Sequence, residues 1–339
     1  MTPEELDECF EFVQNLIRQC GDIFLDGFKD CGKVENKGSH YDLVTVYDRK
    51  IENVLINGIK EKYPNHKFIA EEDQSSTKQP PILTSAPTWI IDPIDGTTNF
   101  IKKLHFVCIS VGFAINNDLK IGFIFNPVLN EFYSARKDQG AFLNGKKIFA
   151  RKSEELKGSL IAQCIHIGGI PAFKHQFMER TTTFLRKTIG IRVFGSAALT
   201  LAYVASGAID AYTIEYLKPW DIAAGVLIVQ EAGGIVIDTN GGDCNIMKPN
   251  IIAAGTMKIA MEIKNVFDEI DARLEIEGKL PRQLMDKSKI QCLSPSLSNH
   301  FTLITFNTQK NNSPKFSLQT KSNLNKNTNF IIILFYLLK

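Results

Sequence analysis

The segment WIIDPIDGTTNF, residues 89–100, carries the most structural and chemical information in this 339-residue chain. Its apolar start predicts a buried strand that ends at Asp92, because Pro93 has no N–H group for the strand ladder. The Gly-Thr-Thr at 96–98 predicts a tight turn opening a helix, whose free N–H groups favour anions. The carboxylates of Asp92 and Asp95 would converge beside those groups. Cations between the carboxylates and a phosphate would explain both features, so the segment predicts a metal-dependent phosphate site.

The overall composition, 44% hydrophobic and 22% charged, is typical of a globular protein. Residues 281–339 carry eight lysines and arginines and one aspartate, which leaves a net charge of −5 on residues 1–280. This acidic body argues against a nucleic-acid partner. The seven cysteines include no Cys-x-x-Cys pair, which favours reduced structural thiols and a cytoplasmic location. The acidic N-terminus does not resemble a signal peptide.

The hydrophobic spacing predicts one catalytic body, residues 1–280, and a tail, residues 281–339. The tail is rich in Ser, Asn, Lys and Gln, and we expect it to be disordered. Its nine apolar residues at 330–338 are too few for a membrane span, which needs about 20. The body alternates between the two element types without a strict βαβ rhythm, which indicates layered α/β or α+β sheets and helices. We expect helices at 2–27, 45–59, 195–207, 221–233 and 257–275, a strand at 67–70, and strands separated by turns over 106–148.

Further carboxylates follow other predicted elements. Glu71 and Glu72 come directly after the strand at 67–70, and adjacent residues of a strand point opposite ways, so at most one can face a shared metal. Asp221 is well placed as the N-cap of the next helix, and capping alone would explain it. Taken with Asp92 and Asp95, however, these groups can build a site for two or three cations. Hard oxygen ligands without a His/Cys cluster favour Mg²⁺ over zinc.

Three segments together resemble the motifs of the inositol monophosphatase family, the Mg²⁺-dependent, lithium-sensitive phosphatases related to fructose bisphosphatase. They are AEED at 70–73, WIIDPIDGTTNF at 89–100 and PWDIAAG at 219–225, with further similarity at 41–48 and 231–234. The resemblance extends from about residue 5 to residue 275. It implies a layered αβαβα sandwich and a homodimer. It also implies hydrolysis of myo-inositol monophosphates such as inositol 1-phosphate, which supplies inositol for phosphatidylinositol signalling.

The resemblance also implies roles for individual residues. A first metal would be held by Glu71, Asp92 and the carbonyl of Ile94, and a second by Asp92, Asp95 and Asp221. A third, weaker ion would share Glu71. Thr97 and Glu71 would orient and deprotonate the attacking water, while the N–H groups of Gly96 and Thr97 would hold the phosphate. The implied substrate contacts are Ile94, Asp95, Gly96, Thr97, Gly195, Ser196, Ala197 and Asp221, and Lys37 and Asp48 match supporting positions behind the ligands, with an ordinary surface ion pair as the alternative.

The chain departs from the family pattern in a few places. Ala70 stands where the family has glycine, and Ser196 where it has threonine. The inositol-binding glutamate of the family aligns with Ile214, while Glu215 lies one position later. Either a bulge re-aims Glu215 towards the substrate, or selectivity for inositol is weakened.

Other functions fit the sequence less well. Phosphatases with an aspartyl nucleophile have carboxylates two residues apart, whereas Asp92 and Asp95 are three apart. The chain has neither a GxxxxGK[ST] nor a GxGxxG nucleotide motif. The remaining alternatives are a 3′-phosphonucleotide or sugar-phosphate phosphatase of the same superfamily, and a non-catalytic scaffold that retained the fold. A scaffold would be expected to lose metal ligands, and this chain keeps them.

Overall fold

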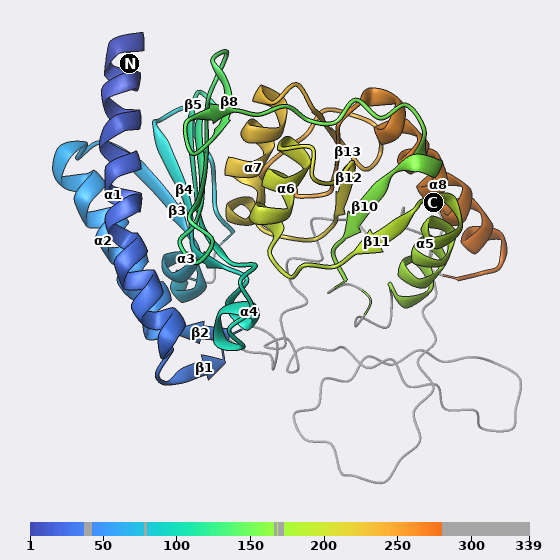
Figure 1. Cartoon of the computed structure of the whole chain (residues 1–339), viewed down its shortest axis with the longest axis horizontal. Helices are drawn as coiled ribbons and strands as arrows, with labels where there is room; N and C mark the ends of the chain where they lie inside the picture. The colour runs from blue at the N-terminus through green and yellow to red at the C-terminus, as the bar shows by residue number, and fades with distance from the viewer. Residues whose placement is uncertain (37–42, 78–79, 166–167, 169–172, 280–339) are drawn as a thin grey trace, which may run out of the picture. The chain divides into compact units, whose positions relative to one another are not determined.

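Two β-sheets lie between three layers of helices in the computed structural model of the chain (Figure 1). The structure describes residues 1–36, 43–77, 80–165, 168 and 173–279, so Lys37 and the tail 281–339 lie outside the described residues. The helices of the three layers are, in order, α1 (Pro3–Lys29) with α2 (Val46–Lys62), α6 (Ala197–Ala205) with α7 (Pro219–Glu231), and α5 (Lys174–Lys187) with α8 (Met257–Ile276). The expected αβαβα sandwich is therefore confirmed.

The first sheet has seven strands, and it contains the strands predicted at 67–70 and 106–148. Its first two strands pair in parallel and every later pair is antiparallel. Their order is β3 (Lys67–Ala70), β4 (Thr88–Asp95), β5 (Cys108–Ile115), β6 (Asp118–Asn126), β7 (Glu131–Arg136), β8 (Gly140–Leu143) and β9 (Lys146–Lys147). The predicted turns at Asn116-Asn117 and Asn144-Gly145 are left-handed, a conformation that Asn and Gly adopt readily.

The second sheet has five strands and mixed pairing, and the hydrophobic pattern did not single it out. Two strands pair in parallel with β10, and the other pairs are antiparallel. Their order is β11 (Gly190–Arg192), β10 (Leu160–Gln163), β12 (Ala211–Ile214), β14 (Ile251–Ala254) and β13 (Ile235–Asp238). The remaining described elements are β1 (Val34–Asn36), β2 (Leu43–Thr45), α3 (Glu71–Thr77), α4 (Thr97–Ile101) and η1 (Leu156–Gly158).

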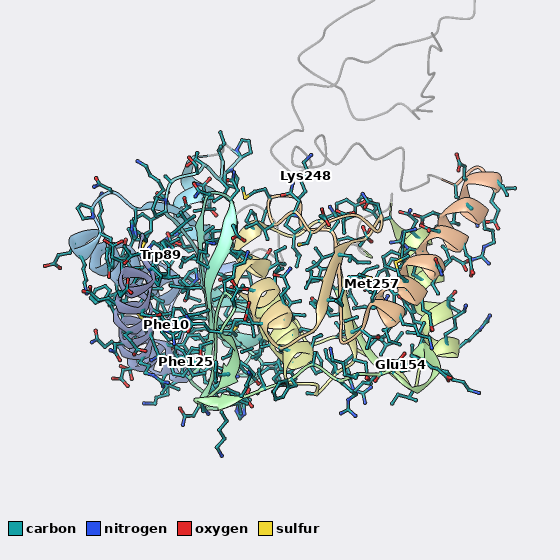
Figure 2. The ribbon with its side chains drawn as sticks, turned by 90° about the horizontal axis from the view of Figure 1, so that it is seen from above. Phe10, Trp89, Phe125, Glu154, Lys248 and Met257 are labelled. Carbon is teal, nitrogen blue, oxygen red and sulfur yellow. The ribbon has the colours of Figure 1, made fainter. Side chains whose placement is uncertain are left out.

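Three hydrophobic clusters fill the spaces between the layers. The first lies between α1, α2 and the seven-stranded sheet, and Phe10, Trp89 and Phe125 belong to it (Figure 2). The second surrounds α6 and α7 between the two sheets, which is why both helices are apolar on almost every side. The third joins the five-stranded sheet to α5 and α8. The predicted site segments therefore meet where the seven-stranded sheet faces the central helical layer.

Local signals explain where the helices begin. Thr2 and Glu5 form a capping box at α1, and Thr45 and Asp48 form one at α2.

The six described cysteines are free thiols, as expected, and burial raises the pKa of Cys20 to about 12. Among the described residues, none of the helices combines the length and the apolar character that crossing a bilayer requires.

Candidate metal centre

Strand β4 contains a bulge that aims Asp92 and Asp95 at the same side of the sheet. Asp92 lies opposite Ser110 of β5, and Asp95 lies opposite Cys108, so three steps along β4 match two along β5. In a regular strand, residues three apart face opposite sides. The prediction that the strand ends at Asp92 is wrong, because β4 continues through Pro93 to Asp95. Proline is tolerated there because a bulge interrupts the ladder.

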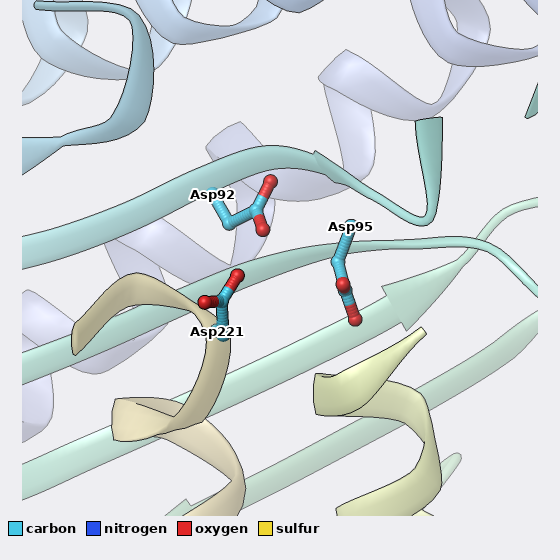
Figure 3. A group of neighbouring side chains, drawn as sticks. All are labelled: Asp92, Asp95 and Asp221. Atoms are coloured by element: carbon cyan, nitrogen blue, oxygen red, sulfur yellow. The ribbon is translucent and has the colours of Figure 1, made fainter. Parts of the chain in front are cut away.

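The third aspartate comes from the central helical layer. Asp221 is the third residue of α7, and its carboxylate accepts the N–H of Lys218 at 2.6 Å. The predicted N-cap position is therefore wrong by one helical turn, since Lys218 occupies it. Asp92, Asp95 and Asp221 nevertheless converge, with one carboxylate oxygen from each lying within 4.8 Å of the other two (Figure 3). Asp92 is 2% exposed and Asp95 is 6% exposed, so two of the three charges lie in the interior.

Glu71 reaches the same region from the neighbouring strand. Strand β3 pairs in parallel with β4, and Ala70 lies opposite Ile91, so the next residues of the two strands, Glu71 and Asp92, are neighbours. The argument from strand alternation fails for the Glu71–Glu72 pair, because α3 begins at Glu71. Glu71 is not one of the three residues whose oxygens lie within 4.8 Å of one another. It is close enough, however, for its charge to raise the pKa of Asp92.

The predicted turn at Gly96 has the geometry that only glycine adopts easily. Its φ is +90°, and a Cβ there would lie 3.1 Å from the carbonyl oxygen of Gly195. Helix α4 begins at Thr97, whose hydroxyl donates to the carbonyl of Ile94 at 3.1 Å. The N–H of Ile94 in turn donates to Asp92 at 3.1 Å. The motif therefore folds back on itself and touches the Gly195 loop.

The start of α6 binds the carboxylate of Asp95 directly. The Ser196 hydroxyl donates to Oδ2 at 2.6 Å, and the N–H of Ala198 donates to the same oxygen at 2.7 Å. The N–H of Ala197 donates to Oδ1 at 3.2 Å. A carboxylate at a helix N-terminus is stabilised by the free N–H groups and the helix dipole. The Gly195–Ala197 loop thus lies against the metal-site candidates, and its expected contact with the substrate stays a prediction.

Burial and mutual repulsion both oppose the charged forms of these carboxylates. Burial raises the pKa of Asp92, and the charges of Glu71, Asp95 and Asp221 raise it further. Burial likewise raises the pKa of Asp95 to about 6, although the donors on α6 counteract it. The pKa of Asp221 is raised by burial and by Asp95, while the N–H of Lys218 lowers it. Positive charge placed among these groups would relieve the repulsion.

The donor set fits a hard divalent cation. Three carboxylates within 4.8 Å of one another supply the oxygen ligands that Mg²⁺ prefers, and Glu71 adds a fourth carboxylate nearby. The burial of Asp92 and Asp95 and the repulsion among the three charges support the same conclusion. The residues therefore fit a metal centre, whereas Mg²⁺ as the particular ion, and the number of ions, stay predictions.

Asp48 and Glu215 each have a partner elsewhere in the fold. Asp48 is buried, and its Oδ2 accepts the N–H of Thr45 at 2.8 Å and the Thr45 hydroxyl at 2.5 Å, so it caps α2. Its supporting role behind the metal ligands stays a prediction. Glu215 is also buried, and it accepts a hydrogen bond from Arg180 at 2.6 Å. The register of β12 with β14 is continuous to Ile214, so the described pairing contains no bulge that would re-aim Glu215.

Two residues near the site were missed by sequence reasoning. Glu52 accepts the N–H groups of Glu72 and Asp73 at 2.8 and 2.9 Å, and burial raises its pKa to about 7. The thiol of Cys108 lies 3.8 Å from Asp95. Glu52 lies on the buried face of α2, four residues after Asp48. Glu52 could have been found from the sequence, because an acidic residue on an apolar helix face indicates a buried polar contact. Cys108 could not have been found, because only the bulge brings it opposite Asp95.

Comparisons with known proteins agree with this geometry. The model of the inositol monophosphatase family matches residues 5–271. Human inositol monophosphatase 1 is 39% identical over 271 residues, which are 80% of this chain and 98% of that protein. The structure of the extragenic suppressor protein suhB from Bartonella henselae has a TM-score of 0.70 and 30% identity, covering 77% of this chain and 99% of that one.

The staphylococcal SaIMPase-II is a further structural neighbour. Its inositol monophosphate-bound structure has a TM-score of 0.66 and 28% identity, and it covers 80% of this chain and 98% of that one. A second structure of SaIMPase-II contains 2′AMP. The family match spans most of the chain and includes every described carboxylate of the metal centre. The chain therefore belongs to the inositol monophosphatase family of phosphoric monoester hydrolases.

Proposed function

We propose that the chain hydrolyses myo-inositol monophosphates, inositol 1-phosphate in particular, to inositol and phosphate with the help of Mg²⁺. The convergence of Asp92, Asp95 and Asp221 beside Glu71 is the observation that supports this proposal most strongly. These four carboxylates and the carbonyl of Ile94 would hold two or three Mg²⁺ ions. When bound, the ions would neutralise phosphate charge, lower the pKa of water and stabilise the departing alkoxide.

The residues of the chain suggest how water would be activated. The hydroxyl of Thr97 donates a hydrogen bond to the carbonyl of Ile94, at 3.1 Å. Its oxygen lone pairs are then directed elsewhere and can accept a hydrogen from the attacking water. Glu71 is the carboxylate proposed to take the proton, as a general base must lie within reach of the group it deprotonates. Thr97 is thus proposed to orient the water, and Glu71 to accept its proton.

The start of α4 supports a phosphate-binding role. The N–H groups of the first helical turn have no partner within the helix, and the left-handed Gly96 directs the chain so that this turn follows Asp95 closely. We propose that Gly96 and Thr97 hold the phosphate with these groups. The backbone of Gly195–Ala197, which touches Gly96, would contact the alcohol part of the ester.

One observation favours a broader substrate range as a second candidate. The position aligned with the inositol-binding glutamate is Ile214, which is fully buried, and Glu215 is bound to Arg180. A substrate hydroxyl would therefore find no carboxylate from this strand. SaIMPase-II, a neighbour of 28% identity, has structures with inositol monophosphate and with 2′AMP. Nucleotides and sugar phosphates should therefore be tested as substrates too.

The test is phosphate release from inositol 1-phosphate, galactose 1-phosphate, 2′-AMP and adenosine 3′,5′-bisphosphate, each with and without Mg²⁺. Asp92→Asn should lose activity, because a ligand shared by two ions is removed. The matched control is Asp118→Asn, the same chemical change at a carboxylate that pairs with Lys120 and Lys137 on the surface. Fastest turnover of inositol 1-phosphate supports the proposal, faster turnover of a nucleotide supports the second candidate, and no Mg²⁺-dependent hydrolysis refutes both.

The expectations of a homodimer, lithium sensitivity, a cytoplasmic location and a role in phosphatidylinositol signalling rest on the family resemblance. They stay predictions, and the first two have direct measurements. Sedimentation gives the oligomeric state, and the same phosphate-release assay with added lithium gives the inhibition.

A further inference from the structure

The two oxygens of Asp95 are held unequally by the chain. Oδ2 accepts the Ser196 hydroxyl at 2.6 Å and the N–H of Ala198 at 2.7 Å, and the Cys108 thiol lies 3.8 Å from it. For Oδ1, the described residues provide one donor, the N–H of Ala197 at 3.2 Å. An ionised carboxylate offers about four lone-pair directions, two on each oxygen. Oδ2 is therefore fully used by the protein, and Oδ1 retains a lone pair for a cation.

The Ser196 side chain is committed to this task. It is 2% exposed, and its hydroxyl has a single hydrogen, which it donates to Asp95 in a hydrogen bond. Its oxygen accepts the N–H of Leu199 at 3.3 Å, and its remaining side faces the Cys108 thiol at 3.7 Å. A hydroxyl with its proton donated and its oxygen enclosed is not available to a substrate. The side chain of Ser196 therefore acts on Asp95, and any contact of this loop with the substrate comes from its backbone.

We propose that Ser196 is a positioning residue, whose hydroxyl fixes the rotation of the Asp95 carboxylate so that Oδ1 faces the cation. This inference rests on the proposed role of Asp95 as a cation ligand. A carboxylate turns about its last single bond with little resistance, so hydrogen bonds to one oxygen fix which oxygen faces the centre. The Ser196 bond to Oδ2 at 2.6 Å is shorter than the backbone bond from Ala198, and it is the one that a substitution can remove. Partners that orient a metal ligand in this way raise its affinity for the metal.

Ser196 also caps α6, so its removal has a structural effect that must be separated from the effect on Asp95. The chain offers a matched control in Thr256, the N-cap of α8. The Thr256 hydroxyl accepts the N–H of Ile259 at 3.3 Å and donates to the carbonyl of Ser153 at 2.8 Å. Thr256→Ala therefore loses the same two kinds of hydrogen bond as Ser196→Ala, without touching Asp95.

The experiment measures Mn²⁺ binding to the full metal-free chain by electron paramagnetic resonance and by calorimetry, without substrate. We expect Ser196→Ala to raise the Mn²⁺ dissociation constant about tenfold or more, the effect typical of lost support behind a metal ligand. Ser196→Thr keeps the hydroxyl and should restore the wild-type value within about threefold. Thr256→Ala and Cys108→Ala should leave the value within about twofold of wild type, because neither removes a strong donor to Oδ2.

The outcomes separate this inference from the proposed function. If Ser196→Ala binds Mn²⁺ as tightly as wild type while remaining folded by circular dichroism, the positioning role is overturned. If Thr256→Ala weakens binding as much as Ser196→Ala, the effect is loss of a cap and the inference is again overturned. If wild type binds Mn²⁺ and the Ser196 series behaves as expected but no phosphomonoester is hydrolysed, the positioning role stands and the proposed function fails. If wild type does not bind Mn²⁺, both fail.

Discussion

Without metal, the charged centre should destabilise the fold at neutral and alkaline pH. Burial raises the pKa of Asp95 to about 6, against an ordinary value of 3.8 for aspartate. A pKa that is higher in the folded chain contributes stability that is complete below pH 3.8 and is lost as the pH rises through about 6. The difference corresponds to about 3 kcal/mol for this one residue. Asp92 and Asp221 shift in the same direction, so their contributions have the same sign.

The sharpest perturbation is Asp92→Asn, compared with wild type in EDTA and in Mg²⁺ at pH 5 and pH 8. Asparagine keeps an oxygen that can accept the N–H of Ile94, but it removes one charge from the cluster. In EDTA at pH 8, we expect the variant to be more stable than wild type, and the difference should shrink at pH 5. In Mg²⁺ the order should reverse, since a hundredfold excess over the dissociation constant stabilises a binding protein by about 2.7 kcal/mol.

Urea unfolding followed by tryptophan fluorescence measures these free energies, because Trp89 and Trp220 are both buried. The comparison with the variant isolates the cluster, since Glu52, whose pKa is raised to about 7, and His66, whose pKa is lowered by burial, are the same in both proteins. If wild type in EDTA at pH 8 is as stable as Asp92→Asn or more so, the carboxylates are not held under repulsion, and the reasoning is refuted.

Arg180→Met should cost about 3–5 kcal/mol in the free energy of unfolding, because the buried carboxylate of Glu215 would lose its ion pair with Arg180. The double variant with Glu215→Leu should lose less stability than Arg180→Met alone, and equal losses would contradict this reasoning. Gly96→Ala should lower the free energy of unfolding by about 1–3 kcal/mol, because alanine is strained at the left-handed φ of +90°. Phosphate release at saturating Mg²⁺ should fall more than the folded fraction does. Full activity in a folded variant would contradict the phosphate-binding role. Burial lowers the pKa of His66, which accepts the indole N–H of Trp89 at 3.0 Å, so its stabilising effect is present above pH 6.5 and is lost as the pH falls through the lowered pKa. His66→Gln should therefore show a flatter loss of stability between pH 7 and pH 5 in the same urea assay, and an unchanged slope would exclude this role.

The parts of the fold that the sequence predicts are those in which local chemistry and long-range packing agree. The capping boxes at Thr2 and Thr45 mark the first residues of α1 and α2, because each satisfies free N–H groups regardless of tertiary context. The hairpin turns of the seven-stranded sheet follow Asn and Gly for the same reason. The five-stranded sheet was not foreseen because its strands have only three or four residues, and β12 and β14 are buried at every position. Such short apolar runs have no periodicity to distinguish them.

The metal centre likewise has features that the local sequence predicts and features that only the tertiary structure determines. The convergence of Asp92, Asp95 and Asp221 was predictable because carboxylates at strand ends and helix starts meet at the edge between layers. The bulge was not predictable, since Pro93 reads as a strand end unless the pairing with β5 is known. The pairing of Glu215 with Arg180 was equally hidden, because those residues lie 35 positions apart and meet only in the folded chain. Sequence thus indicated which residues meet, and tertiary structure determined how each one is aimed.

The bulge in β4 makes the length of the motif more constrained than its composition. A substitution between Asp92 and Asp95 changes one side chain, whereas deletion of Pro93 or Ile94 would remove the bulge and leave the two carboxylates two residues apart in a regular strand. The pairings with Ser110 and Cys108 could persist, but the bulged backbone that places the Ile94 carbonyl against the Thr97 hydroxyl would be lost. In evolutionary terms, this stretch should tolerate exchanges of amino acids at Pro93 and Ile94 far better than insertions or deletions. A library of single-residue deletions across residues 92–96 should therefore yield almost no active enzyme, even where point variants at the same positions survive.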